Sequence, residues 1–218
     1  VSIRECFYKM KKEFGKKDPL IRQLIWRDFY YHLGYGFIDR FGKSLKEQYD
    51  GIKWSNNSSQ LQKWKDGNTG YPIVDACMKQ INTTGYMHNR GRLIVASFLV
   101  KNLQINWEAG EKYFAQTLLD YDVLVNNGNW QWVSGSGADS MPYFRIFNPW
   151  TQSEKFDKDC EYIKYWLPNL KDVENKHLHQ WEKFYTEYDL KEIDYVKPMI
   201  DYKESREKTL KMYKKGLY

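Results

Sequence analysis

The sequence predicts an all-α fold, and three observations lead to that prediction. Apolar residues recur at helical spacing in several segments, capping residues or prolines precede them, and no segment alternates polar and apolar residues over the length of a strand. The 218 residues are 42% hydrophobic, which suits one compact domain over residues 1–218. Cys6, Cys77 and Cys160 are far apart and form no CxxC motif, so neither a disulfide scaffold nor a zinc ribbon is indicated.

Local signals place the individual helices. Asp18 and Pro19 open the second one, and Gly85 lies just after the third. Asn106 is the expected cap of a helix with Trp107, Gly110, Phe114 and Leu118 along one stripe. A loop is expected over 67–71. The segments expected to be helical are 2–13, 19–33, 72–84, 88–103, the segment from 107, 155–167 and 202–217.

Charge is concentrated at the two ends of the chain. The net charge is +6, but residues 1–17 carry six cations and two acids, and residues 201–218 carry six cations and three acids. The stretch between them is therefore close to neutral. Basic ends on a neutral body are typical of solvated helix faces, so charge alone does not indicate nucleic acid. No secretory leader or membrane-spanning run is recognisable, and the cysteine pattern favours a reducing intracellular compartment, cytoplasm or nucleus.

Residues 123–153 differ from the rest of the chain. Only Asp139 and Arg145 are charged there, although charged residues make up 28% of the sequence. Amides, glycines and rings fill the stretch instead, as in the run Asn-Asn-Gly-Asn-Trp-Gln-Trp over 126–132. A planar heteroaromatic ligand needs rings at its faces and hydrogen bonds at its edges. Such a ligand site and a buried loop whose amides bond to the backbone are two open interpretations of this composition.

The common catalytic motifs are absent from the sequence. It contains no Walker A loop, no dinucleotide fingerprint, no HExxH motif and no G-x-S-x-G elbow. His177 and His179 have no convergent carboxylate or thiolate in the sequence, so they are expected to be a surface pair rather than metal ligands. We therefore predict no metal site.

Five motifs resemble the photolyase/cryptochrome family in order and spacing. They are Thr69-Gly-Tyr-Pro-Ile-Val-Asp-Ala, Thr84-Gly-Tyr-Met-His-Asn-Arg, Ala96-Ser-Phe-Leu, Asn126-Asn-Gly-Asn-Trp-Gln-Trp and Pro142-Tyr-Phe-Arg-Ile-Phe-Asn-Pro. From near residue 2 to beyond residue 200, the chain resembles the helical FAD-binding domain of CPD photolyases. The resemblance implies light-driven splitting of cyclobutane pyrimidine dimers in UV-damaged DNA, by electron transfer from reduced FAD to a dimer flipped out of the duplex.

The same resemblance assigns residues to the cofactor. It implies that Asn126 faces the N5 edge of the flavin, and that Asp120 and Asp122 contact the polar edge of the flavin and its ribose. Arg92 would pair with Asp120, because an arginine in an apolar helix is costly without a partner. Asn89 would lie beside the cofactor and the lesion. Without the resemblance, Asp120 and Asp122 would be interpreted as ordinary helix-end caps.

Three tryptophans match the positions of the family's electron relay. The resemblance implies that Trp130, Trp107 and Trp54 pass an electron from the protein surface to photoexcited flavin. Indole suits this role because it is readily oxidised. The alternative interpretation is ordinary core packing, which is the usual fate of tryptophan.

A further set of residues matches the DNA side of the family's site. Trp26 and Trp132 match two rings that wedge the flipped dimer, and stacking of this kind contributes about 1–3 kcal/mol per base whatever the sequence. The other positions that the resemblance assigns to the lesion and the DNA backbone are Asn89, Arg90, Leu93, Arg145 and Gln152. Arg90 has an alternative interpretation as a solvated residue at a helix N-terminus, although its charge opposes the helix dipole there.

Some positions depart from the family pattern. Gln23 stands where CPD photolyases usually carry a glutamate that supports the lesion's radical anion, so we expect reduced efficiency rather than loss of activity. Tyr86 replaces a usual tryptophan, and Leu93 replaces a usual methionine. The sequence also begins just after the place of the family's serine-rich loop, which holds the FAD diphosphate, and of its N-terminal α/β antenna domain. We therefore expect a split or truncated photolyase, with a separate N-terminal half as a candidate partner.

Two other functions remain open on the sequence. A cryptochrome-like blue-light sensor would use the same cofactor and tryptophans, and Gln23 favours it weakly. A catalytically inactive remnant would only bind DNA or a partner protein. A (6-4) photolyase is disfavoured, because its pattern has two histidines where this chain has His88 and Asn89.

Overall fold

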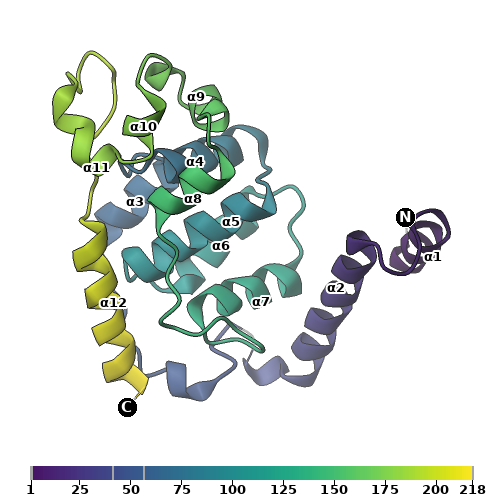
Figure 1. Cartoon of the computed structure of the whole chain (residues 1–218). Coiled ribbons are helices and arrows are strands. Elements are labelled where there is room, and N and C mark those ends of the chain that lie inside the picture. The colour runs from purple at the N-terminus through teal and green to yellow at the C-terminus, as the bar shows by residue number, and fades with distance from the viewer. Residues whose placement is uncertain (1, 41, 56, 218) are drawn as a thin grey trace.

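The computed structural model describes residues 2–40, 42–55 and 57–217, and in them it shows helices and no strand (Figure 1). Ser55 and Ile105 form an isolated bridge. The predicted all-α fold is therefore confirmed. The α-helices are α1 (Ile3–Phe14), α2 (Pro19–Gly36), α3 (Ser58–Asp66), α4 (Pro72–Thr84), α5 (Asn89–Ser97), α6 (Trp107–Thr117), α7 (Val123–Ser134), α8 (Pro149–Phe156), α9 (Glu161–Trp166), α10 (Asn175–Leu178), α11 (Trp181–Phe184) and α12 (Tyr202–Leu217). Short 3-10 turns occupy Ile38–Arg40, Glu47–Tyr49, Pro168–Leu170 and Tyr185–Glu187.

Helix α5 and the π-helical turn η3 (Phe98–Asn102) form the centre of the molecule. All residues from 94 to 103 are buried, and a segment that is buried on every side belongs in a core. Helices α4, α6, α7 and α12 contact this segment. The predicted helix over 88–103 is confirmed, with a π-helical last turn that the sequence pattern does not signal.

Helices α1 and α2 extend away from this body, and α2 approaches it alongside α7 (Figure 1). Glycines on both helices allow the approach. A Cβ atom on Gly128 would lie 2.3 Å from the ring of Tyr30, and one on Gly34 would lie 2.4 Å from the side chain of Leu124. Because neither contact leaves room for a methyl group, the glycines fix how closely α2 lies on α7. This closeness brings the first turns of α2 to one side of the helical body.

Several predicted helix ends are confirmed by their caps. The side chain of Asp18 accepts a hydrogen bond from the amide of Leu20, and Asn106 accepts one from Glu108. Gly85 ends α4 in the left-handed conformation, with φ of 68°. Helix α12 spans the predicted 202–217. No helix within the described residues is both long and apolar enough to span a membrane.

The prediction of one helix over 155–167 is wrong. Helix α8 ends at Phe156 and α9 begins at Glu161, and Cys160 between them has a left-handed φ of 54°. The carboxylate of Asp157 causes the break, because it accepts the amides of Tyr162 and Ile163 at 3.0 and 2.9 Å and so starts a new helix. Helices α3, α7, α10 and α11 were not predicted.

The expectation of a surface histidine pair is also wrong for His179. This side chain is buried, and its Nδ1 atom lies 2.8 Å from the hydroxyl of Ser153. Its Nε2 atom lies 2.9 Å from the carbonyl oxygen of Lys158. The ring therefore joins the end of α8 to the segment after α10. Within the described residues no group of three or more His, Cys, Asp or Glu side chains is placed to hold a metal ion.

Lys101 is a fully buried lysine in the π-helical turn. Its Nζ atom donates hydrogen bonds to the carbonyl oxygens of Ser134 and Tyr143 at 2.9 and 3.4 Å and lies 3.9 Å from the ring centroid of Tyr213. These partners are neutral, so burial lowers the pKa of Lys101 well below its ordinary value. Between the lowered pKa and about pH 10.4, this lysine is protonated in the unfolded chain but not in the folded one. The free energy of unfolding therefore rises with pH across that window.

Replacing Lys101 with methionine is expected to raise the free energy of unfolding by about 1–2 kcal/mol near neutral pH. The reason is that an apolar side chain can be buried without the desolvation cost of an amino group. The carbonyl of Ser134 keeps a bond from Tyr213 Oη at 2.7 Å. Urea unfolding at a series of pH values should show a flatter pH dependence in this variant. The exposed Lys112→Met serves as the control, and equal slopes in both variants would contradict the assignment.

Candidate functional site

A cavity of about 320 Å3 lies between α2, α5, α6 and α7. Side chains from all four helices line it, together with the loop before α7. It gathers eight of the residues that the sequence predicts for the site. These are Gln23, Asn89, Arg92, Leu93, Asp120, Asp122, Asn126 and Trp130.

The sides of the cavity are apolar. Phe114 and Leu118 come from the stripe of α6 that the sequence pattern indicates, and Val125 and Val133 come from α7. These four residues were not predicted for the site, but the helical spacing of Phe114 and Leu118 with Gly110 could have signalled their common face. The sides therefore suit the faces of a planar apolar ring.

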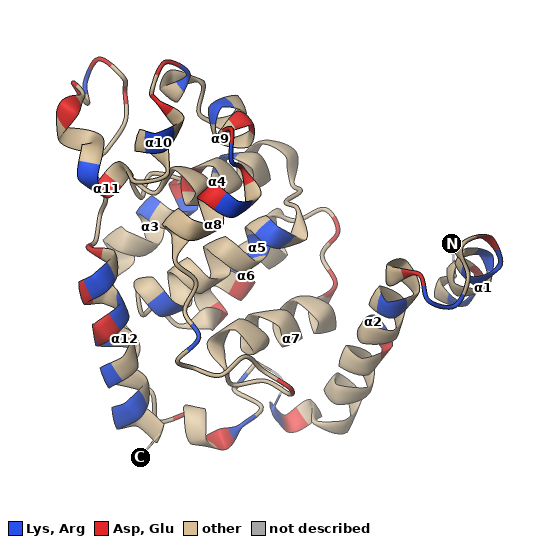
Figure 2. Ribbon diagram, viewed as in Figure 1, with Lys and Arg blue, Asp and Glu red and all other residues tan. Residues whose placement is uncertain are grey.

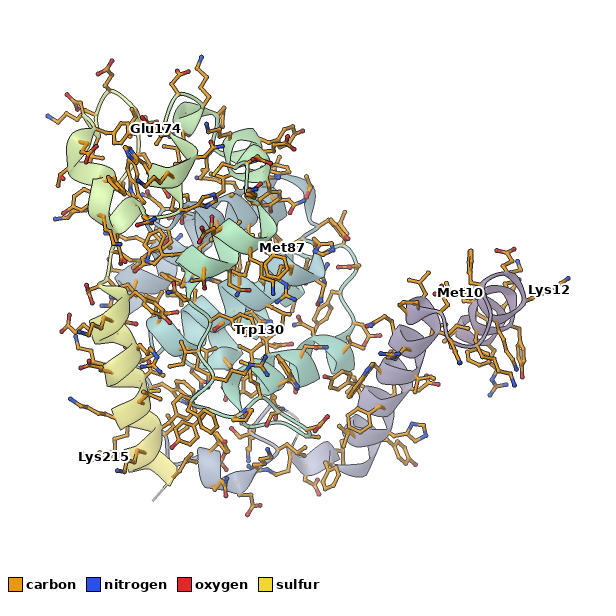
Figure 3. The ribbon with its side chains drawn as sticks, in the orientation of Figure 1. Met10, Lys12, Met87, Trp130, Glu174 and Lys215 are labelled. Atoms are coloured by element: carbon orange, nitrogen blue, oxygen red, sulfur yellow. The ribbon has the colours of Figure 1, made fainter. Side chains whose placement is uncertain are left out.

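Trp130 forms one wall of the cavity and is only 3% exposed. Its ring meets that of Phe114 edge-on, with centroids 5.1 Å apart. Gly110 on α6 makes room for it, since a Cβ atom there would lie 2.2 Å from the indole. Figure 3 labels Trp130 and Met87, another lining residue, within the helical body.

The rim of the cavity carries the predicted ion pair. Arg92 donates two hydrogen bonds from Nη2 to the carboxylate of Asp120, at 2.8 and 3.0 Å. Its Nε atom donates to the carbonyl oxygen of Met87 at 2.6 Å. The guanidinium is thus fixed at two points, and it orients Asp120 at the mouth of the cavity.

Asn126 is held by a residue that the sequence analysis missed. Its Nδ2 atom donates to Glu111, at 3.2 Å to the backbone carbonyl and 3.0 Å to the carboxylate. A carboxylate only accepts, so this contact fixes which end of the amide faces α6. Within the described residues Asn126 Oδ1 accepts no hydrogen bond, so the cavity contains an acceptor of fixed orientation. No local pattern links Glu111 to Asn126, which lies 15 residues further on.

The other two predicted relay tryptophans lie outside the cavity. Trp107 is buried at the start of α6, and Trp54 is half-buried, with its ring edge-on to Tyr213 at 5.8 Å. No direct ring contact joins Trp130, Trp107 and Trp54 among the described residues. The structure therefore supports their core packing and leaves the relay as a proposal.

The predicted DNA residues are spread over several elements. Trp26 on α2 is 39% exposed, whereas Trp132 is half-buried against the core. The guanidinium of Arg90 lies 4.2 Å from the ring centroid of Phe156, which explains how a cation is held at this helix N-terminus. Two others lie further along the chain: Arg145 is exposed, while Gln152 is half-buried and its Oε1 atom has no hydrogen-bond partner in the part of the chain that the structure describes.

The long charge-poor stretch lies at this site. Helix α7 carries no charged residue and appears entirely tan in Figure 2. Its amides divide between two roles. Asn127 bonds internally, its Oδ1 accepting from Gln131 at 2.8 Å, whereas Asn126 leaves an acceptor free at the cavity. The interpretation as an internally bonded amide therefore suits Asn127, and the interpretation as part of a ligand site suits Asn126.

The cavity as a whole suits a planar heteroaromatic cofactor. It has apolar sides, an aromatic wall, an oriented amide and an acid at its mouth. Its volume lies at the lower end of the range for small-molecule sites, which is enough for a ring system. Arg92 is the only cation among its lining residues and is already paired with Asp120, so the cavity itself offers little to a diphosphate. The residues present would fit the ring system of a flavin, and they supply no unpaired cation for its phosphates.

Fold and cavity together define a helical cofactor-binding domain, and comparison with known proteins shows which one. Residues 20–215 match the family described as the FAD binding domain of DNA photolyase, and the chain belongs to this family.

Relatives and solved structures agree with this assignment. The chain is 44% identical to the deoxyribodipyrimidine photo-lyase of Escherichia coli (strain K12), over 98% of this chain and 46% of that protein. It is 49% identical to the same enzyme of Buchnera aphidicola subsp. Acyrthosiphon pisum, over 91% of this chain and 41% of that protein. The chain therefore spans a little under half the length of these relatives.

Two solved structures resemble it over nearly its whole length. An archaeal photolyase from Sulfolobus tokodaii, solved with two FAD molecules, has a TM-score of 0.89 at 43% identity and covers 99% of this chain and 47% of its own. A cryptochrome from Synechocystis sp. PCC6803 has a TM-score of 0.84 at 34% identity, with coverages of 97% and 46%.

Proposed function

We propose that this chain is the FAD-binding part of a light-driven DNA repair enzyme that splits cyclobutane pyrimidine dimers. The observation that carries the proposal is the cavity, which gathers Asn126, Asp120, Arg92, Gln23 and Trp130 from three helices and the loop before α7. The names of the relatives and of the matching family support the same function.

Bound FAD would supply the electron that opens the dimer when light excites it. The chain's own residues position the ring for this step. Asn126, held by Glu111, would present its Oδ1 oxygen to a ring N–H group. Asp120, held by Arg92, would accept a hydrogen bond from the ring's polar edge. The apolar sides of the cavity would limit water around Asn126 and so strengthen its contact, whereas Asp120 lies at the exposed mouth.

Trp130 would deliver an electron to the cofactor site, because its indole forms the cavity wall. Trp107 and Trp54 would complete the path to the surface, since Trp54 is half-buried and Trp107 lies in the core between α6 and its neighbours. We propose this relay on the family resemblance together with these positions.

The lesion would enter from the α2 side. Trp26 is exposed there, and Gln23 lines the cavity one helical turn earlier on the same helix. An exposed ring suits stacking on a flipped base. We propose Trp132, Asn89, Arg90 and Leu93 as further contacts of the dimer and its phosphates. Arg145 and Gln152 are proposed as contacts of the DNA backbone.

Replacing Gln23 with glutamate is expected to raise the quantum yield of dimer repair about two- to five-fold. A protonated carboxyl group donates a stronger hydrogen bond to a developing anion than an amide does. Repair per absorbed photon should be measured on a dimer-containing oligonucleotide. Gln48→Glu, at an exposed site on the turn Glu47–Tyr49, introduces the same side chain away from the cavity and serves as the control. An unchanged or lower yield in Gln23→Glu would contradict the assigned role.

A separate N-terminal half of a photolyase is the partner that we propose for this chain. The cavity offers no unpaired cation to the phosphates of FAD, so residues elsewhere must hold them. The free cysteines Cys6, Cys77 and Cys160 fit a reducing, DNA-containing compartment such as the cytoplasm or nucleus. Flavin titration with and without a candidate half tests the partnership. Equally tight stoichiometric binding by the lone chain would refute it.

The test of the function is repair itself. The purified chain with FAD and a reductant, and with a candidate N-terminal half, should restore irradiated DNA in blue light and not in darkness. Flavin binding without repair would favour the cryptochrome-like sensor, which the Synechocystis structure keeps as the second candidate. A chain that binds DNA but no flavin would be an inactive remnant.

A further inference from the structure

Two side chains of α2 converge on the carboxylate of Asp122 at the cavity rim. Tyr31 donates its hydroxyl to Asp122 Oδ2 at 2.9 Å, and Arg27 Nε lies 3.5 Å from the same oxygen. The other oxygen, Oδ1, accepts the amides of Leu124 and Val125, both at 3.2 Å, and so caps α7. One carboxylate thus joins the start of α7 to the middle of α2.

Arg27 and Tyr31 also contact each other within α2. They lie four residues apart on α2 and therefore share a face. The guanidinium of Arg27 lies 3.9 Å from the ring centroid of Tyr31, a cation–π contact that aligns both groups. The hydrogen bond to Asp122 raises the pKa of Tyr31, as expected for a hydroxyl that donates to a carboxylate.

Few other polar contacts hold α2 to α7 within the described residues. Tyr30 Oη reaches Asn129 Oδ1 only at 3.5 Å, the limit of a hydrogen bond. Only Ile21 and Tyr30 of α2 are buried. Most of α2 is therefore not buried, and its hydrogen bond to Asp122 is shorter than the contact between Tyr30 and Asn129.

The position of this tie matters because it joins two elements that both contribute residues to the proposed site. Asp122 lines the cavity, and so does Gln23, eight residues before Tyr31 on the same helix. Trp26, which we propose to stack on the lesion, lies between Gln23 and Tyr31 in the sequence of α2. Any change in the spacing between α2 and α7 therefore changes the distance between lesion and cofactor residues.

We propose that Tyr31 and Arg27 are positioning residues that hold Asp122 at the cavity rim and fix the lesion-facing helix α2 against α7. This inference rests on the proposed function and adds two residues to its site. Neither residue has to touch the cofactor or the dimer; both act through Asp122.

Hydrogen exchange on the intact chain tests the tie without any cofactor. Tyr31→Phe removes the hydroxyl alone, and peptides of α2 should then exchange about three- to ten-fold faster, since a hydrogen bond to a charged group is lost. Tyr35→Phe is the matched control, because Tyr35 lies one turn further on and is 88% exposed. Urea unfolding should show the same global stability in both variants. Equal exchange of α2 in the two variants would overturn the proposal.

Flavin affinity tests the positioning role. The dissociation constant for FAD should rise about three- to ten-fold in Tyr31→Phe and remain unchanged in Tyr35→Phe. In an Asp122→Asn background the further effect of Tyr31→Phe should disappear, because the two residues act as one unit. Additive effects of the two substitutions would contradict the proposal.

The two measurements separate this inference from the function on which it rests. If no variant binds flavin, the proposed function fails, while hydrogen exchange still decides whether the tie exists. If flavin binds and Tyr31→Phe behaves like its control in both experiments, the function stands and the positioning role is wrong.

Discussion

Replacing Trp130 with phenylalanine is expected to reduce the light-driven reduction of bound flavin more than about 100-fold, since each 1.4 kcal/mol added to a barrier slows a step tenfold. A phenyl ring is far harder to oxidise than indole. The substitution keeps an apolar ring in the cavity wall, so the cofactor should still bind. Loss of the absorption of oxidised flavin under blue light, with an external reductant, measures the rate at saturating flavin.

Trp64→Phe is the matched control for this experiment. Trp64 is also fully buried, and its ring centroid lies 6.3 Å from that of Trp130, but it does not line the cavity. Its Nε1 atom donates to the carbonyl oxygen of Val95, so its replacement should lower stability and leave photoreduction nearly unchanged. Photoreduction that survives in Trp130→Phe, or fails equally in Trp64→Phe, would contradict the assigned role of Trp130.

Replacing Gly110 with alanine is expected to lower the free energy of unfolding by about 1–3 kcal/mol and to displace Trp130 from the cavity wall. The new Cβ atom would lie 2.2 Å from the indole and 2.6 Å from a methyl group of Leu99. Helices α6 and α7 would have to separate, and the wall would move with them. Thermal unfolding and flavin titration should both report the change.

Gly36→Ala provides the comparison, because it is also helical and a Cβ atom there meets nothing within 4 Å. That substitution should be neutral or slightly stabilising, as alanine favours helix over glycine. If Gly110→Ala is equally harmless and keeps its flavin affinity, the close packing of α6 on Trp130 is not what shapes the cavity.

The fold could be predicted where local chemistry agrees with packing. Helices α4 and α12 have clear boundaries in the sequence, and Asn106 marks the start of α6. Helix α7 was not predicted because three asparagines and Gly128 are poor helix formers. It forms because Asp122 caps it and because α2, α5 and α6 pack on it, contacts between residues far apart in the sequence.

The site follows the same division. The resemblance predicted Arg92, Asp120 and Asn126, and the structure brings all three to one cavity. The residues that hold these side chains in place could not be predicted in the same way. Glu111 lies 15 residues from Asn126, and Tyr31 lies 91 residues from Asp122, so no local pattern connects either pair. Such supporting contacts are set by tertiary packing.

The most direct test of the account is a titration of the purified chain with FAD, followed by flavin fluorescence, in two variants beside the original chain. Leu93→Trp fills the cavity from its half-buried rim, whereas Leu20→Trp places the same ring at an exposed site on α2. We expect saturable quenching by the unchanged chain and by Leu20→Trp, because Trp130 lies against the bound ring, and none by Leu93→Trp. Quenching that never saturates, or that survives filling of the cavity, would show that flavin does not bind beside Asn126.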